Sequence, residues 1–152
     1  MPLLVPLAPG SPAPPVPGLE ETEGPRALFF YKVTCPVCQM AAPKVEAFER
    51  GYPGRILGIG QDPEPELTAF SGAAGMTFPS LSDLRPFPLS NAYGIRTVPT
   101  MFLVEGGLVR ATVEAWDRNG LNALSREMAD RMGEPFAPVS RDGDGLPPFR
   151  PG

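Results

Sequence analysis

The sequence predicts an α/β fold in which helices flank a central mixed β-sheet. Short apolar segments suited to buried strands alternate with segments whose apolar residues recur at the spacing of one helix face. Two alternating apolar segments around a Gly-Gly turn predict an antiparallel hairpin within this pattern. The 22 Pro and 17 Gly gather toward the ends of the 152-residue chain, so the middle is free to form a domain.

These ends define the domain organisation that we expect. Residues 26–133 would form one domain, because 152 residues suit a single core and 42% of them are hydrophobic. Residues 1–25 are a proline-rich N-terminal arm that we expect to pack on the domain as an extended segment, with a polyproline linker as the alternative. Residues 134–152 are expected to form an irregular C-terminal tail.

Charge and composition exclude several classes of function. Thirteen Lys and Arg against 17 Asp and Glu give a net charge of −4 without a basic run, so nucleic acid is not an expected partner. The absence of His removes His-based catalysis and most zinc sites. No apolar stretch approaches the roughly 18 residues of a membrane helix, and no secretory signal is visible. We therefore expect a cytoplasmic protein without a membrane segment.

The first strand and helix surround both cysteines of the chain. Residues 27–31 (ALFFY) predict a buried strand because they are apolar, aromatic and β-prone. The following segment predicts a helix with Pro36 in its first turn and an apolar face formed by Cys38, Ala41, Val45 and Phe48. Cys35 therefore lies at the helix N-terminus, where unpaired backbone N–H groups and the helix dipole stabilise a thiolate. Cys38 faces the interior one turn later.

The next strand and helix are shorter. Residues 55–61 (RILGIGQ) predict a second strand. Asp62 as the N-cap and Pro63 at the first helical position then begin a short helix that ends near Phe70. Residues 77–82 (TFPSLS) are expected to connect this helix to the hairpin.

The hairpin and a final helix complete the domain. The hairpin turns at residues 105–107, and its alternating apolar residues are Met101, Leu103, Leu108 and Val113. The last helix begins at Asp117 or Asn119, which are both good N-caps, and ends at Gly133. Its apolar stripe consists of Leu121, Leu124, Met128 and Met132.

The motif Cys35-Pro36-Val37-Cys38 admits several interpretations. A zinc or iron–sulfur site normally needs four ligands, whereas the chain has two Cys and no His. A structural disulfide across so short a loop would restrict the unfolded chain little. Two reduced core cysteines without a role are a further alternative. Redox catalysis fits best, because it uses an accessible thiol at a helix N-terminus and a second thiol behind it.

This motif and two other segments resemble the thioredoxin superfamily, and in particular its redoxin branch of TlpA- and ResA-like thiol-disulfide oxidoreductases. Residues 93–100 (YGIRTVPT) and the hairpin after them are similar to the segment in which a Pro with a cis peptide bond opens a strand. Pro43 stands where thioredoxins kink the active-site helix. Residues 7–16 are similar to the leader of redoxins. The resemblance covers residues 7–133 and implies a thioredoxin-like fold.

The resemblance also implies an activity. The protein would be a thiol-disulfide oxidoreductase in which Cys35 attacks a protein disulfide and Cys38 resolves the mixed disulfide. The dithiol carries the electrons, so no cofactor or metal is expected, and an unknown thiol would be the electron donor. The expected substrate contacts lie beside the thiols and are Val98, Pro99, Pro36 and Trp116. We expect a monomer.

Trp116 has two interpretations. It follows the second hairpin strand, whose end returns to the sheet edge where Pro99 and Cys35 are expected, so its ring could face a substrate. A ring packed in the core or against the last helix is the alternative.

Departures from the family pattern leave the mechanism incomplete. Thr34 stands where most thioredoxins have Trp, and Phe29 and Ala41 stand where relatives place an acid that serves the resolving thiol. The sequence therefore identifies no proton acceptor for Cys38 and leaves the direction of electron flow open. A peroxiredoxin-like peroxidase and a non-enzymatic redox or metal-binding module are alternatives. Family analogy makes a location outside the cytoplasm the alternative to a cytoplasmic one.

Overall fold

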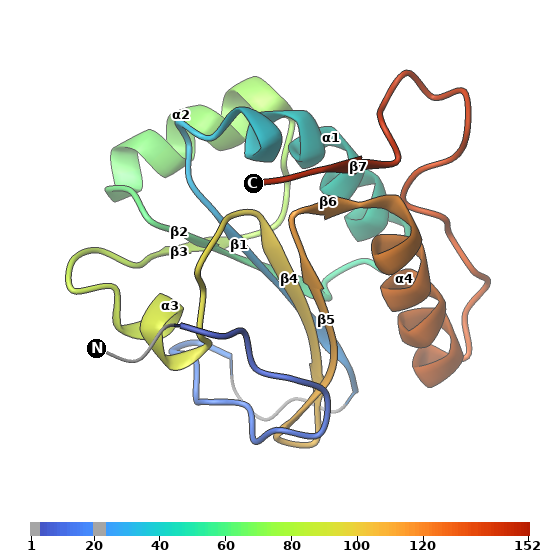
Figure 1. Ribbon diagram of the computed structural model, residues 1–152, viewed down its shortest axis with the longest axis horizontal. Coiled ribbons are helices and arrows are strands. Elements are labelled where there is room, and N and C mark those ends of the chain that lie inside the picture. Colours follow the sequence, from blue (N-terminus) through green and yellow to red (C-terminus); the bar gives the residue numbers. More distant parts are fainter. Residues whose placement is uncertain (1–3, 20–23) are drawn as a thin grey trace.

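A five-stranded mixed β-sheet forms the centre of the computed structural model, which describes residues 4–19 and 24–152 (Figure 1). Its spatial order is β3-β2-β1-β4-β5. The strands are β1 (Arg26–Tyr31), β2 (Ile56–Gly60), β3 (Ser80–Ser82), β4 (Thr100–Glu105) and β5 (Leu108–Glu114). β1, β2 and β3 run parallel, whereas β4 is antiparallel to β1 and β5 is antiparallel to β4. The predicted mixed sheet and hairpin are confirmed.

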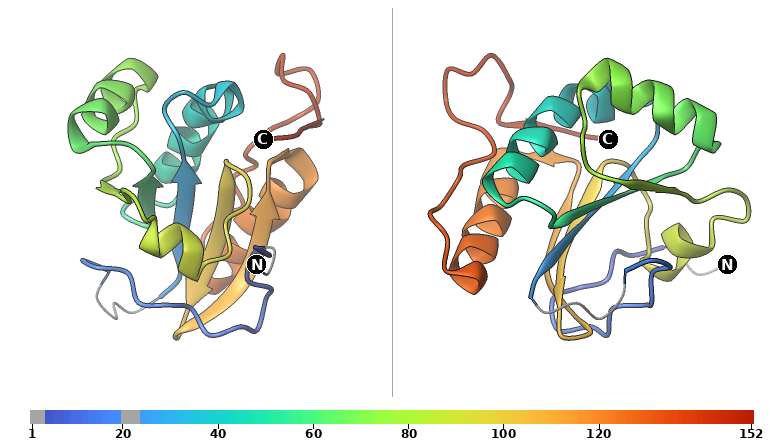
Figure 2. Two further views of the ribbon diagram at one scale, coloured as in Figure 1. Left: turned by 60° about the vertical axis from the view of Figure 1, so that its left-hand side comes forward. Right: turned by 180° about the vertical axis from the view of Figure 1, so that it is seen from behind.

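Both faces of the sheet are covered, because side chains alternate along a strand and both sets on β1 are apolar. Phe29 and Tyr31 pack in one core with α1 (Pro36–Gly51), α2 (Glu64–Ala74) and α4 (Arg118–Met132). Leu28 and Phe30 pack in a second core against the segment that contains α3 (Pro88–Ala92) and against the N-terminal arm. Figure 2 shows these two layers on either side of the sheet.

The described part of the N-terminal arm runs along the β4–β5 hairpin (Figure 1). Backbone N–H groups of Gly10 and Ala13 donate to the carbonyls of Val109 and Gly107 at 2.8 and 2.9 Å. A Cβ on Gly94, whose φ is +73°, would overlap the backbone of Val5, which shows how closely the arm approaches. Residues 1–3 and 20–23 of the predicted arm lie outside the described residues.

The second helix differs from its prediction. α2 begins at Glu64 with Pro63 as the N-cap residue, and it ends at Ala74, four residues after the predicted Phe70. Asp62 does not cap this helix, because its carboxylate accepts a hydrogen bond from the Val33 N–H at 2.8 Å. The prediction of Asp62 as N-cap was therefore wrong.

Four short elements lie where no strand or helix was predicted. β3 occupies part of the expected connection at residues 77–82, and α3 precedes the segment that leads to β4. The C-terminal tail contains β7 (Phe149–Arg150), which pairs in an antiparallel manner with β6 (Trp116–Asp117). The last helix is as predicted: Asp117 is its N-cap and Gly133, in the left-handed conformation, ends it. Among the helices of the described residues, none has the length and apolar character to cross a membrane.

Candidate active site

The two cysteines lie where β1 leads into α1. β1 ends at Tyr31, and Cys35 is the N-cap of α1 with φ −81° and ψ 116°. Pro36 occupies the first turn, where its lack of an N–H costs no helical hydrogen bond. The predicted position of Cys35 at the helix N-terminus is confirmed.

Cys35 is the more accessible of the two thiols. It is half-buried, and the backbone N–H of Cys38 donates a hydrogen bond to its Sγ atom at 3.2 Å. Such a donor stabilises a negatively charged sulfur, as does the helix N-terminus. The Cys35 thiol in turn lies 3.5 Å from the carbonyl oxygen of Val98, to which it donates. The sulfur is therefore oriented between the start of α1 and the segment before β4.

Cys38 lies behind Cys35 and has an exposed fraction of 0%. Burial raises the pKa of the Cys38 thiol well above its ordinary value, because a thiolate is poorly solvated there. The hydrogen bond with Cys35 and the negative charges of Cys35 and Asp62 act in the same direction. Both cysteines are free, so the pair combines a thiol at the surface with a protonated thiol in the interior.

Asp62 is the carboxylate that sequence analysis did not assign to this site. Its Oδ2 atom accepts the Val33 N–H at 2.8 Å, which holds the carboxylate against the β1–α1 loop. Phe29 and Ala41, the positions at which the resemblance to thioredoxins implied an acid, are both 2% exposed within the apolar core. The signal in the sequence was the position of Asp62 directly after a strand, since the C-terminal ends of parallel neighbouring strands meet at one sheet edge.

The segment before β4 forms the other side of the site. The Val98–Pro99 peptide bond is cis, and Val98 is partly buried against both cores. The carbonyl of Pro99 accepts a hydrogen bond from the Ala115 N–H at 2.8 Å, which ties this segment to the end of β5. The structure thus brings Cys35, Cys38, Pro36, Val98 and Pro99 together at one end of the sheet.

Trp116 lies beneath this site and not on its rim. Its exposed fraction is 0%, and its indole N–H donates to the carbonyl of Pro147 at 2.6 Å. Ala115 adopts φ +64°, a turn of the backbone that ends β5 and directs the chain inward. Trp116 shares the lining of a small cavity with Pro99, so it contacts the site from inside. The interpretation of Trp116 as a substrate-facing ring was therefore wrong, and its ring packs in the core.

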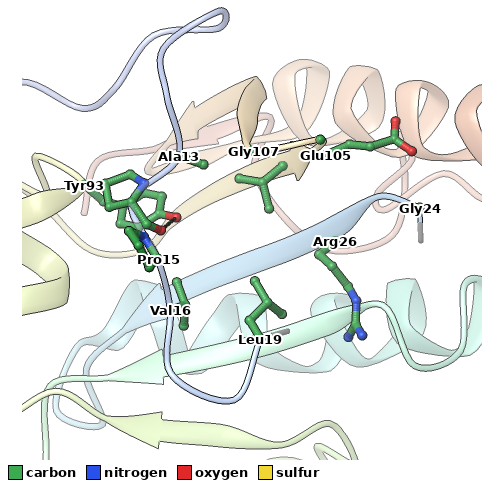
Figure 3. Close-up of a pocket in the computed structure, with 12 residues that line it drawn as sticks. Ala13, Pro15, Val16, Leu19, Gly24, Arg26, Tyr93, Glu105 and Gly107 are labelled. Atoms are coloured by element: carbon green, nitrogen blue, oxygen red, sulfur yellow. Dashed lines mark hydrogen bonds between the residues drawn. The ribbon is translucent and has the colours of Figure 1, made fainter. Parts of the chain in front are cut away.

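A larger cavity, of about 430 Å³, lies at the opposite end of the sheet (Figure 3). The arm residues Ala13, Pro15 and Val16 form one wall, and Arg26 and the β4–β5 turn contribute to the others. Neither thiol lines it, so this cavity is separate from the redox chemistry. Within residues 4–19 and 24–152, no cluster of three or more acidic or Cys side chains is placed to hold a metal ion.

Comparisons with known proteins agree with this geometry. The model of the AhpC/TSA family matches residues 18–112. The structure is similar to a putative thiol:disulfide interchange protein DsbE from Chlorobium tepidum, with a TM-score of 0.72 and 20% identity over 84% of this chain and 99% of that one. No curated protein matches the sequence.

Two further solved structures are similar over a smaller part of the chain. StoA from Bacillus subtilis has a TM-score of 0.52 and 25% identity over 60% of this chain and 75% of that one. A secreted disulfide oxidoreductase of Mycobacterium tuberculosis has a TM-score of 0.56 and 18% identity over 69% and 81%. These likenesses confirm the predicted thioredoxin-like fold and the resemblance to redoxins.

Proposed function

The chain belongs to the AhpC/TSA family, and we propose that it is a thiol-disulfide oxidoreductase that exchanges electrons with protein disulfides through Cys35 and Cys38. One observation carries the proposal. An accessible thiol caps α1 and accepts the N–H of Cys38, whose own thiol is buried directly behind it. This is the arrangement that a nucleophilic thiol and its resolving partner require.

The reaction proceeds in two exchanges. The Cys35 thiolate attacks one sulfur of the substrate disulfide, a bond forms between Cys35 and that sulfur, and the other substrate sulfur leaves and takes up a proton. Cys38 then loses its proton and attacks the Cys35 sulfur, which releases the second substrate thiol. Two electrons and two protons pass from the dithiol to the substrate. A thiol electron donor restores the Cys35–Cys38 dithiol by the reverse exchange, so no cofactor is required.

The substrate chain binds as an extended strand beside Val98. The carbonyl of Val98 lies 3.5 Å from the Cys35 sulfur, so a backbone N–H next to the substrate disulfide reaches this carbonyl when its sulfur meets Cys35. The carbonyl of Pro99 accepts a hydrogen bond from the Ala115 N–H, and this bond holds Val98 in position. Pro36 flanks the thiol on the other side. Trp116 supports Pro99 from the interior.

Asp62 receives the proton that Cys38 loses. Burial keeps Cys38 protonated, so its attack requires a base, and Asp62 is close enough for its charge to raise the pKa of this thiol. Its anchor to the Val33 N–H leaves the second carboxylate oxygen for this role. Asp62 would thus take the role of the acid that the family resemblance implied at position 29 or 41, where this chain has Phe29 and Ala41.

Reduction of insulin by dithiothreitol tests the proposal. The protein should accelerate the appearance of turbidity, and Cys35→Ser should abolish the acceleration. Cys38→Ser is the matched control, because it keeps the attacking thiol and should accumulate a mixed disulfide that mass spectrometry detects. Full activity in Cys35→Ser would refute the proposal. Consumption of peroxide coupled to a thiol, in place of insulin reduction, would support the peroxiredoxin-like alternative.

The reduction potential of the dithiol assigns the direction of electron flow. A value near about −270 mV corresponds to a reductase, and a value near about −120 mV to an oxidase. Cytoplasmic location stays a prediction, which fractionation of cells that express the full chain tests.

A further inference from the structure

The C-terminal tail returns to the redox site. Its last six residues, 147–152, are here named the C-terminal strap, and they run from the start of α4 toward the loop before β4 (Figures 1 and 2). Phe149 pairs with Asp117 and Arg150 pairs with Trp116, so the strap continues as a strand along β6. The sequence predicted only an irregular tail here.

The end of the strap packs on the segment that we assign to substrate binding. A Cβ built on Gly152 would overlap the carbonyl oxygen of Val98 and the Oγ1 atom of Thr97. The backbone of Gly152 therefore lies against the Val98 carbonyl and the Thr97 side chain, and only glycine fits without a shift of the strap or of these two residues. The same carbonyl accepts the Cys35 thiol at 3.5 Å. Gly152 therefore lies against the carbonyl that accepts the Cys35 thiol.

Several hydrogen bonds hold the strap in this place. The indole N–H of Trp116 donates to the Pro147 carbonyl at 2.6 Å, and the Arg118 N–H donates to the Pro148 carbonyl at 2.9 Å. The buried guanidinium of Arg118 donates to the carbonyl of Leu146 at 2.7 Å, just before the strap begins. Strand pairing, an indole and a buried cation together make the strap an ordered part of the site.

A second network fixes the loop that precedes the strap. Asp144 accepts the Ser140 hydroxyl at 2.6 Å and forms ion pairs with Lys44 at 3.1 Å and Arg118 at 3.5 Å. Lys44 belongs to α1, the helix that begins at the cysteines. The loop is therefore attached to the same helix that carries the thiols, which fixes the direction in which the strap leaves it.

We propose that the C-terminal strap determines substrate specificity by occupying the place of a substrate strand at Val98, an inference that rests on the proposed function. With the strap closed, the half-buried Cys35 reacts with small disulfides that need no strand pairing. A protein disulfide pairs with Val98 only after the strap has left. The apparent affinity for protein substrates is the affinity of the open form multiplied by the fraction of molecules whose strap is open. The chemistry at Cys35 is unchanged.

Two disulfides of different size test this. The reduced full-length protein is mixed with excess insulin or excess oxidised glutathione, the reaction is quenched by alkylation, and the loss of the dithiol is followed by mass spectrometry. Gly152→Ala introduces the overlapping Cβ, and Gly72→Ala is the matched control, since a Cβ there meets nothing within 4 Å. Arg118→Met, which removes the donor to Leu146, is a second strap variant.

The expected result is a change in the ratio of the two rates. Gly152→Ala and Arg118→Met should raise the rate with insulin about tenfold relative to the rate with oxidised glutathione, while Gly72→Ala keeps the ratio of the unchanged protein. Equal ratios in all four proteins would overturn the strap proposal and leave the proposed function intact. Failure of the unchanged protein to react with either disulfide would instead refute the proposed function.

Discussion

Replacement of Arg118 by Met tests how strongly the tail is attached to the domain. The guanidinium is 9% exposed and donates to Ser140 Oγ at 3.0 Å, to Asp142 at 2.7 Å and to the Leu146 carbonyl at 2.7 Å. Asp142 is fully exposed, so its ion pair contributes little. The other two bonds contribute about 1.5–3 kcal/mol each, because the donor is charged. Burial of the Met side chain offsets about 1–2 kcal/mol.

The net loss in the free energy of unfolding is therefore about 3 kcal/mol, which corresponds to a fall in Tm of about 6–12 °C for a domain of this size. Calorimetry measures it, with Arg50→Met as the control. Arg50 has a side chain that is 76% exposed and an ion pair with Glu46 at 3.5 Å, so its loss should cost less than about 0.5 kcal/mol. If the two variants had the same Tm, Arg118 would not anchor the tail.

Three predictions concern titration and proton transfer. Because burial raises the pKa of Cys38, decay of the mixed disulfide in Asp62→Asn, which lacks the proposed base, should quicken about tenfold per pH unit between pH 6 and 9, measured by quenched mass spectrometry, and the dependence on pH should be less steep in the unchanged protein. Asp62→Asn should slow this decay at pH 7 and leave the formation of the mixed disulfide unchanged; equal decay rates would remove Asp62 from the mechanism. The Ser140 hydroxyl and nearby backbone N–H groups hold the pKa of Asp144 well below its usual range. Its contribution to stability is thus complete above about pH 4 and is lost as pH falls further, so Trp116 emission should shift to the red on acidification, and less so in Asp144→Asn.

The core elements could be predicted from sequence because their apolar patterns are local. Residues 27–31 are apolar on both faces, as a central strand requires, and α1 and α4 show one apolar stripe each. The positions of the two cysteines on α1 could be predicted from the same local pattern. The preceding strand and Pro36 mark the start of the helix, and the helix period then indicates which thiol faces outward. These elements could therefore be assigned without knowledge of their tertiary contacts.

The elements that were missed depend on distant partners. β3 has three residues, two of them Ser, and it is a strand because β2 pairs with it in parallel. Asp62 has the sequence pattern of an N-cap, but the Val33 N–H competes for its carboxylate. α3 follows Phe87, which adopts φ 56°, a conformation that apolar periodicity does not signal. For β3 and for Asp62 the decisive contact comes from another part of the chain, whereas α3 depends on an unusual local backbone angle.

The position of the C-terminal tail also depends on contacts with distant residues, and here this has a consequence for function. Its Pro, Gly and Asp residues predict irregular structure, and the structure is indeed largely irregular, yet Arg118 and Trp116 give it one position. The reaction and the recognition of a substrate thus reside on separate segments. Cys35 and Cys38 lie within one turn of α1, whereas Val98 and Gly152 come from segments more than 50 residues apart. Because the strap lies against the carbonyl that we propose for substrate pairing, a change in the strap should alter which disulfides reach Cys35 without altering the thiol itself.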